Sequence, residues 1–76
     1  MAVTYTSQIQ PQYHRELIIF TDMYGATSKL YIYANQAAMR DSLIKSRLAI
    51  AQANEAGMTA LMLAASPSSP PSSPPQ

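Results

Sequence analysis

The first part of the chain alternates between apolar and polar residues with a period of two. In residues 2–9, Val3, Tyr5, Ser7 and Ile9 lie on one side, and threonine and glutamine residues lie on the other. This alternation, with β-branched and aromatic residues, is typical of a half-buried strand, and Pro11 ends it. We therefore expect an N-terminal strand over residues 2–9.

Residues 15–34 have the pattern of a β-hairpin. A short apolar run (residues 15–21) is followed by a turn over residues 22–28, in which Gly25 can adopt a positive φ. Alternation then returns over residues 29–34. It places Leu30 and Ile32 on one side of the second strand, and Lys29, Tyr31 and Tyr33 on the other side.

Residues 36–56 predict a long helix, because they are rich in strong helix formers and contain no glycine or proline. Asn35 is a suitable N-cap, and Gly57 stands where a glycine commonly ends a helix. Residues 58–65 are almost uniformly apolar, so periodicity does not decide between a strand and a helix. Leucine, methionine and alanine favour a helix, but we expect a fourth strand here because it would pair into the sheet.

The predicted helix has two apolar ridges. One contains Met39, Leu43 and Ile50; the other contains Ala37, Ile44, Leu48 and Ala51. Arg40 and Arg47 lie between the ridges. If the sheet covers one ridge, the other is left for a second protein chain. Alternatively, both ridges belong to one broad core stripe, with the arginines reaching solvent at its edge.

The C-terminal residues 66–76 differ in composition from the rest of the chain. They contain the unit Ser-Ser-Pro-Pro twice and carry no charge. Prolines at this density prevent helix and sheet, which predicts an extended or disordered tail. Two PxxP sequences lack a flanking arginine, so a passive arm is a better interpretation than an SH3 ligand. The chain thus divides into a single domain (residues 1–65) and a Pro/Ser-rich tail (residues 66–76).

Together these elements predict a small α+β fold. An antiparallel sheet, made of the N-terminal strand, the hairpin and a possible fourth strand, packs on one long helix.

The composition is unusually poor in charge. Only 12% of the 76 residues are charged, and residues 1–65 still reach only about 14%, against about 25% in typical globular domains. The net charge of +1 argues against duplex-DNA binding. No apolar run approaches the length of a membrane span, and residues 1–10 lack the features of a secretory signal. We expect an intracellular (cytoplasmic) protein, or one packaged in a particle.

Residues suited to catalysis are few. The chain has one histidine (His14), four carboxylates and no cysteine, and it has neither a glycine-rich phosphate loop nor a metal-ligand spacing. We expect no enzyme activity, no cofactor and no metal site.

Our first hypothesis is a non-catalytic structural or interaction subunit of a larger protein assembly. It could be a component of a virion or other multi-copy particle, or an accessory subunit, since a permanently covered surface needs little charge. The partners are then other protein chains. The candidate interface residues are Tyr31, Tyr33, Arg40, Ile44, Arg47, Leu48 and Ala51.

Two alternatives belong to other classes. A single-stranded nucleic-acid-binding module would use Lys29, Tyr31, Tyr33 and Arg47, because aromatic residues on a strand face can stack bases. A small inhibitor or adaptor would dock by strand addition through residues 2–9, or through the open helix ridge.

Overall fold

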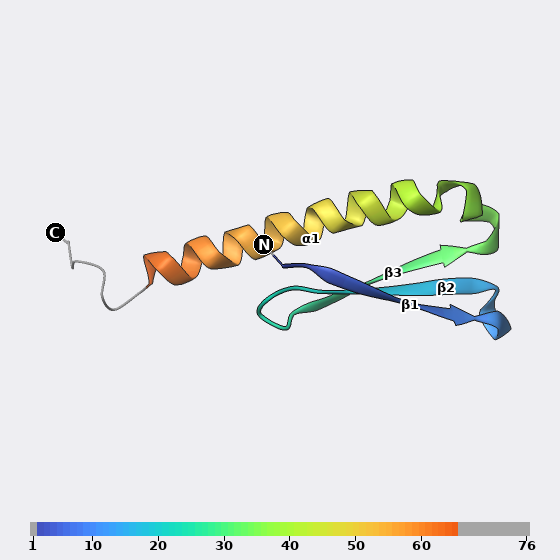
Figure 1. Cartoon of the computed structure of the whole chain (residues 1–76), viewed down its shortest axis with the longest axis horizontal. Helices are drawn as coiled ribbons and strands as arrows, with labels where there is room; N and C mark the ends of the chain where they lie inside the picture. Colours follow the sequence, from blue (N-terminus) through green and yellow to red (C-terminus); the bar gives the residue numbers. More distant parts are fainter. Residues whose placement is uncertain (1, 66–76) are drawn as a thin grey trace, which may run out of the picture.

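A computed structural model describes residues 2–65. The predicted tail, residues 66–76, lies outside the described residues. In chain order the elements are β1 (Thr4–Gln10), the 3₁₀ helix η1 (Pro11–Tyr13), β2 (Arg15–Thr21), β3 (Thr27–Tyr33), the 3₁₀ helix η2 (Ala34–Met39) and α1 (Arg40–Ala64). Figure 1 shows two layers, with α1 lying along one face of the sheet.

The three strands form an antiparallel sheet in the order β1-β2-β3. Their pairing is continuous: β1 runs from Thr4 opposite Thr21 to Gln10 opposite Arg15. β3 pairs with the other side of β2, from Arg15 opposite Tyr33 to Thr21 opposite Thr27. The small α+β fold predicted from the sequence is confirmed, including the N-terminal strand and the hairpin.

The core lies between α1 and the inner face of the sheet. Ile18, Phe20, Ile32 and Ile44 are buried together. Partly buried apolar side chains surround them: Val3, Leu30, Leu43, Leu48 and Ala51. Leu30 and Ile32 therefore face the helix as predicted, and Tyr31 and Tyr33 face away from it.

Two turns set the geometry of the sheet. In the β2–β3 turn, one Asp22 carboxylate oxygen accepts hydrogen bonds from the N–H groups of Tyr24 (2.9 Å) and Ala26 (3.0 Å). Gly25 has a φ of 83°, as its predicted role in this turn requires. After η1, His14 has a φ of 51°, and its carbonyl accepts a hydrogen bond from the Ala34 N–H at 3.0 Å.

The helix differs from the prediction at both ends. Asn35 is not the N-cap, because a 3₁₀ helix with its cap at Tyr33 occupies residues 34–39 and α1 begins at Arg40. Gly57 does not end α1, and residues 58–64 continue it instead of forming a fourth strand. One glycine inside a helix is unfavourable by only about 1 kcal/mol, and the leucine, methionine and alanine that follow are strong helix formers.

Candidate interaction surfaces

The end of α1 projects beyond the sheet. At about 1.5 Å per residue, 25 helical residues span about 37 Å, whereas a strand of seven residues spans about 23 Å. Figure 1 shows α1 continuing past the β2–β3 turn. We call residues 58–65 the overhang.

Glu55, just before the overhang, and Thr59, at its start, hold α1 to the rest of the fold. The Glu55 side chain is completely buried, and its two carboxyl oxygens accept hydrogen bonds from the N–H groups of Ala2 and Met23, both at 2.9 Å. One turn later, the hydroxyl groups of Thr59 and Tyr24 are hydrogen-bonded. These contacts fix the helix to the segment that precedes β1 and to the β2–β3 turn.

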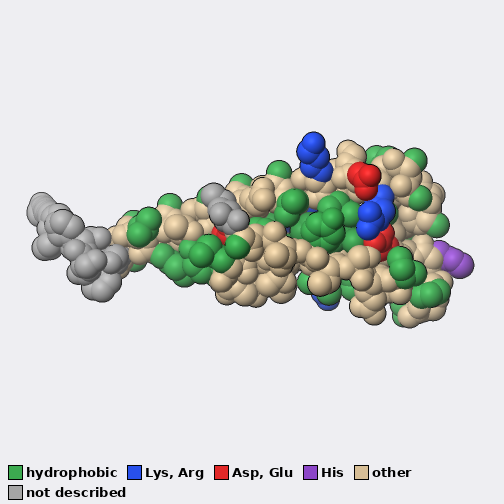
Figure 2. Space-filling view, in the orientation of Figure 1, with side chains coloured by type: hydrophobic (Ala, Val, Ile, Leu, Met, Phe, Trp, Pro, Cys, Tyr) green, Lys and Arg blue, Asp and Glu red, His purple; other side chains and the backbone are tan. Residues whose placement is uncertain are grey.

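The overhang exposes large apolar side chains. Leu61 and Leu63 are each 68% exposed, Met62 is 50% exposed, and Met58 is 43% exposed. Figure 2 shows hydrophobic side chains at this projecting end of the molecule. A cluster of this kind on the surface is typical of an interaction site.

The overhang continues the stripe of α1 that faces the core. Met62 comes eighteen residues after Ile44, which is five turns at 3.6 residues per turn, so both side chains leave the helix in the same direction. Ile44 is only 6% exposed because the sheet lies beneath it. Met62 has the same orientation but lies beyond the sheet.

The predicted interface residues do not form one surface. Ile44, Leu48 and Ala51, placed on the ridge offered to a partner, pack in or against the core of this chain. The ridge of Met39 and Ile50 is the exposed one, while Leu43 packs at the edge of the core. Hydrophobic periodicity detected both ridges but could not show which of them faces the sheet.

Arg40 is held within the chain by an ion pair. Its guanidinium donates from Nε and Nη2 to the two carboxylate oxygens of Glu16, at 2.6 and 2.8 Å. The hydrogen bonds from Arg40 and from the Ser7 hydroxyl lower the pKa of Glu16 from 4.5 to about 2, and the same pair raises the pKa of Arg40. This pair joins β2 to the start of α1.

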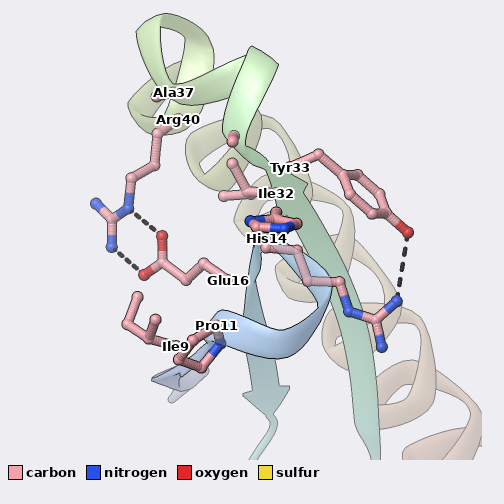
Figure 3. Close-up of a pocket in the computed structure, with 10 residues that line it drawn as sticks. Ile9, Pro11, His14, Glu16, Ile32, Tyr33, Ala37 and Arg40 are labelled. Carbon is pink, nitrogen blue, oxygen red and sulfur yellow. Dashed lines mark hydrogen bonds and ion pairs between the residues drawn. The ribbon is translucent and has the colours of Figure 1, made fainter.

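Beside this pair is an open hollow of about 480 Å³ at the end of the sheet. Its wall is mainly apolar, with Ile9, Pro11, Ile32 and Ala37 among the lining residues (Figure 3). Two polar contacts lie at its rim: Glu16 pairs with Arg40, and Arg15 donates to the Tyr33 hydroxyl at 3.4 Å. His14 also lines the hollow (Figure 3).

The outer face of the sheet, which is turned away from α1, carries a tyrosine cluster around Arg15. The Arg15 guanidinium lies 4.2 Å from the ring centre of Tyr31, 4.5 Å from that of Tyr13 and 6.0 Å from that of Tyr33. Tyr5 is not part of it, because it packs on Phe20 on the inner side. The sequence pattern indicated the two strand tyrosines but not the arginine that organises them.

The predicted nucleic-acid residues are divided between the two layers. Lys29, Tyr31 and Tyr33 lie on the outer face, whereas Arg47 is on α1, which covers the other face. Strand alternation places Glu16 on the inner side, so no Asp or Glu side chain of β1, β2 or β3 faces outward. Arg15 and Lys29 are the charged residues of this face.

Residues 2–65 contain no group of three or more histidine or acidic residues that could hold a metal ion. Within the same residues, no helix has the length and apolar character needed to cross a membrane. Comparison with known proteins gives no match among protein families, curated proteins or solved structures.

Proposed function

We propose that the protein is a non-catalytic subunit of a larger protein assembly, in which another protein chain covers the overhang of α1. The observation that carries this proposal is the position of Met58 and Met62. Both continue the core-facing stripe of the helix at a point where the sheet has ended.

The physical reason is the free energy of leaving these side chains in water. Fully burying one leucine or methionine side chain is favourable by about 1.5–3 kcal/mol, and the overhang exposes four such residues. A helix end that extends beyond the sheet is also prone to fray, because most helical stability in proteins comes from tertiary packing. An apolar partner surface would supply both contributions.

The low charge of the chain supports the same proposal. A free monomer relies on surface charge for solubility, and this chain has a net charge of only +1. A component of a multi-copy particle, or an accessory subunit of a complex, has less need of charge on the surfaces that its neighbours cover.

Light scattering of the purified full chain tests the proposal. We expect particles heavier than the 8.3 kDa monomer, with a mass that rises between about 1 µM and about 1 mM protein. Met62→Glu should lower this mass, because it places a charge in the covered stripe.

Ala60→Glu is the matched control. It adds the same charge to the same turn of the overhang, but sixteen residues after Ile44, or about 160° round the helix from the core-facing direction. The particle mass of this variant should remain close to that of the wild type. A chain that stays monomeric at the highest concentration would contradict a particle built from copies of this chain, and equal effects of the two variants would contradict a role of the overhang in assembly.

A second candidate function is single-stranded nucleic-acid binding at the outer face. The observation that favours it is a face with Arg15, Lys29 and three tyrosines but no acidic side chain from the strands. Fluorescence anisotropy with a labelled single-stranded oligonucleotide should then show binding at low salt that weakens as salt is added.

Matched variants separate this function from nonspecific attraction to a basic chain. Lys29→Ala should weaken binding, whereas Lys45→Ala, which removes an exposed lysine from α1, should leave it almost unchanged. Absence of binding at low salt would exclude the nucleic-acid function.

A further inference from the structure

We propose that β1 pairs edge to edge with β1 of a second copy of this chain, in antiparallel orientation, so that two three-stranded sheets join into one sheet of six strands. This interface is separate from the overhang and does not depend on it.

Within residues 2–65, no strand pairs with the outer edge of β1, and this edge lacks the features that usually prevent pairing. β1 is the first strand of the sheet, and it pairs over all seven residues with β2 without a bulge. Edge strands are commonly protected by charged residues, internal prolines or bulges, and Thr4–Gln10 contains none of these. The opposite edge strand, β3, carries Lys29.

The helix leaves the inner face of β1 uncovered. The core side chains that meet Ile44 come from β2 and β3. On β1, Tyr5 remains 46% exposed and Ile9 remains 65% exposed. Both side chains point to the inner side of the sheet, next to the layer that contains α1.

The sequence of β1 is complementary to itself about Ser7. With a two-fold axis at Ser7, antiparallel pairing places Tyr5 of each copy opposite Ile9 of the other, and Thr6 opposite Gln8. Aromatic residues opposite β-branched residues are favourable cross-strand pairs. This register therefore covers the exposed apolar side chains of both copies.

Electrostatic repulsion does not oppose this pairing. β1 has no charged side chain, and each chain has a net charge of only +1. Because an isologous contact uses the same strand of both copies, it closes at two chains and removes both β1 edges. A contact of one strand pair is small, so we expect a reversible dimer that dissociates on dilution.

Charge placement at Thr6 and Gln8 tests both the pairing and its register. These side chains are exposed on the outer face, and each would lie opposite the other across the axis. Thr6→Lys/Gln8→Lys places lysines of the two copies opposite each other and should shift the chain to monomer. Thr6→Lys/Gln8→Glu places a lysine of one copy opposite a glutamate of the other at both positions and should keep the dimer.

Sedimentation equilibrium would measure the masses, with all chains also carrying Met62→Glu so that the overhang does not contribute. The expected mass of the parent is 16.6 kDa, twice the monomer mass of 8.3 kDa. A monomeric parent would overturn the proposal, as would equal masses for the two charge variants. The effect of Met62→Glu alone on the particle mass tests only the overhang. The two proposals can therefore fail independently of each other.

A cysteine introduced at Ser7 gives an independent measurement that does not need charged variants. The chain has no cysteine, and the two-fold axis places position 7 of one copy next to position 7 of the other. Ser7→Cys should form a disulfide-linked dimer on mild oxidation much faster than Thr4→Cys, which lies opposite Gln10 in this register. Equal rates would overturn the proposed register.

Discussion

Glu55 shows how one residue connects three parts of the molecule. Its side chain is buried on α1, yet its two oxygens accept the N–H groups of Ala2 and Met23, which lie far from it in sequence. A buried acidic residue requires such partners, since an unsatisfied polar group in the interior is unfavourable. Composition alone gave no sign of this role, because the two partners are backbone groups.

Removing this side chain should destabilise the fold strongly. We expect Glu55→Ala to lower the free energy of unfolding by about 2–4 kcal/mol, because two N–H groups lose their acceptors. Urea denaturation followed by circular dichroism measures the change. Asn54→Ala, at an exposed neighbouring position, is the control and should change the free energy by less than about 0.5 kcal/mol. Equal effects of the two variants would contradict the role of Glu55.

The ion pair between Glu16 and Arg40 makes stability depend on pH. Arg40 lowers the pKa of Glu16 in the folded state to about 2, whereas the ordinary value is 4.5. The folded chain therefore binds fewer protons than the unfolded chain between these values. The stabilisation is complete above pH 4.5 and decreases as the pH falls towards 2.

We expect the free energy of unfolding to fall as the pH is lowered from 5 to 2.5, and Glu16→Gln to reduce this fall. Denaturant titrations at several pH values measure both effects. Asp41→Asn removes a carboxylate with 99% side-chain exposure that lies 3.5 Å from Arg40, and it should leave the pH dependence almost unchanged. A wild-type pH dependence retained in Glu16→Gln would contradict the assignment.

At the scale of elements, the sequence predicted the sheet better than the helix ends. Alternation located β1 and β3, and a short apolar run located β2, whose Ile18 and Phe20 lie in the core. The extent of α1 was wrong because Gly57 was interpreted as a terminator. Local sequence does not distinguish a helix-ending glycine from one that the helix passes through, since that depends on the conformation adopted there.

Two glycine substitutions test this correction, because they should change the free energy of unfolding in opposite directions. Gly57 lies inside α1 with open space where a Cβ would stand, so Gly57→Ala should stabilise the protein by about 0.5–1 kcal/mol. Gly25 has a positive φ, so Gly25→Ala should destabilise it by about 1 kcal/mol. Thermal or urea denaturation measures both. Destabilisation by Gly57→Ala would show that the helix ends at that residue.

At the scale of the whole molecule, the overhang arises because α1 is longer than the strands that it covers. The sheet supports α1 as far as Glu55 and Thr59, and the helix then continues without it. The sequence revealed an excess of apolar side chains, and it predicted Tyr31 and Tyr33 on the outer face correctly. It could not reveal that Ile44 and Leu48 face the sheet while Met58 and Met62 extend past it, because this depends on where the last strand ends.

Amide hydrogen exchange of the full chain, compared at low and high protein concentration, tests the central claim most directly. If other copies of the chain cover the overhang, the amides of residues 58–65 should exchange more slowly at high protein concentration, because burial suppresses fraying of the helix end. The amides of β2, already inside the sheet, should change little. Rapid exchange of residues 58–65 at every concentration, while the mass of the particles increases, would contradict the claim that the overhang is the assembling surface.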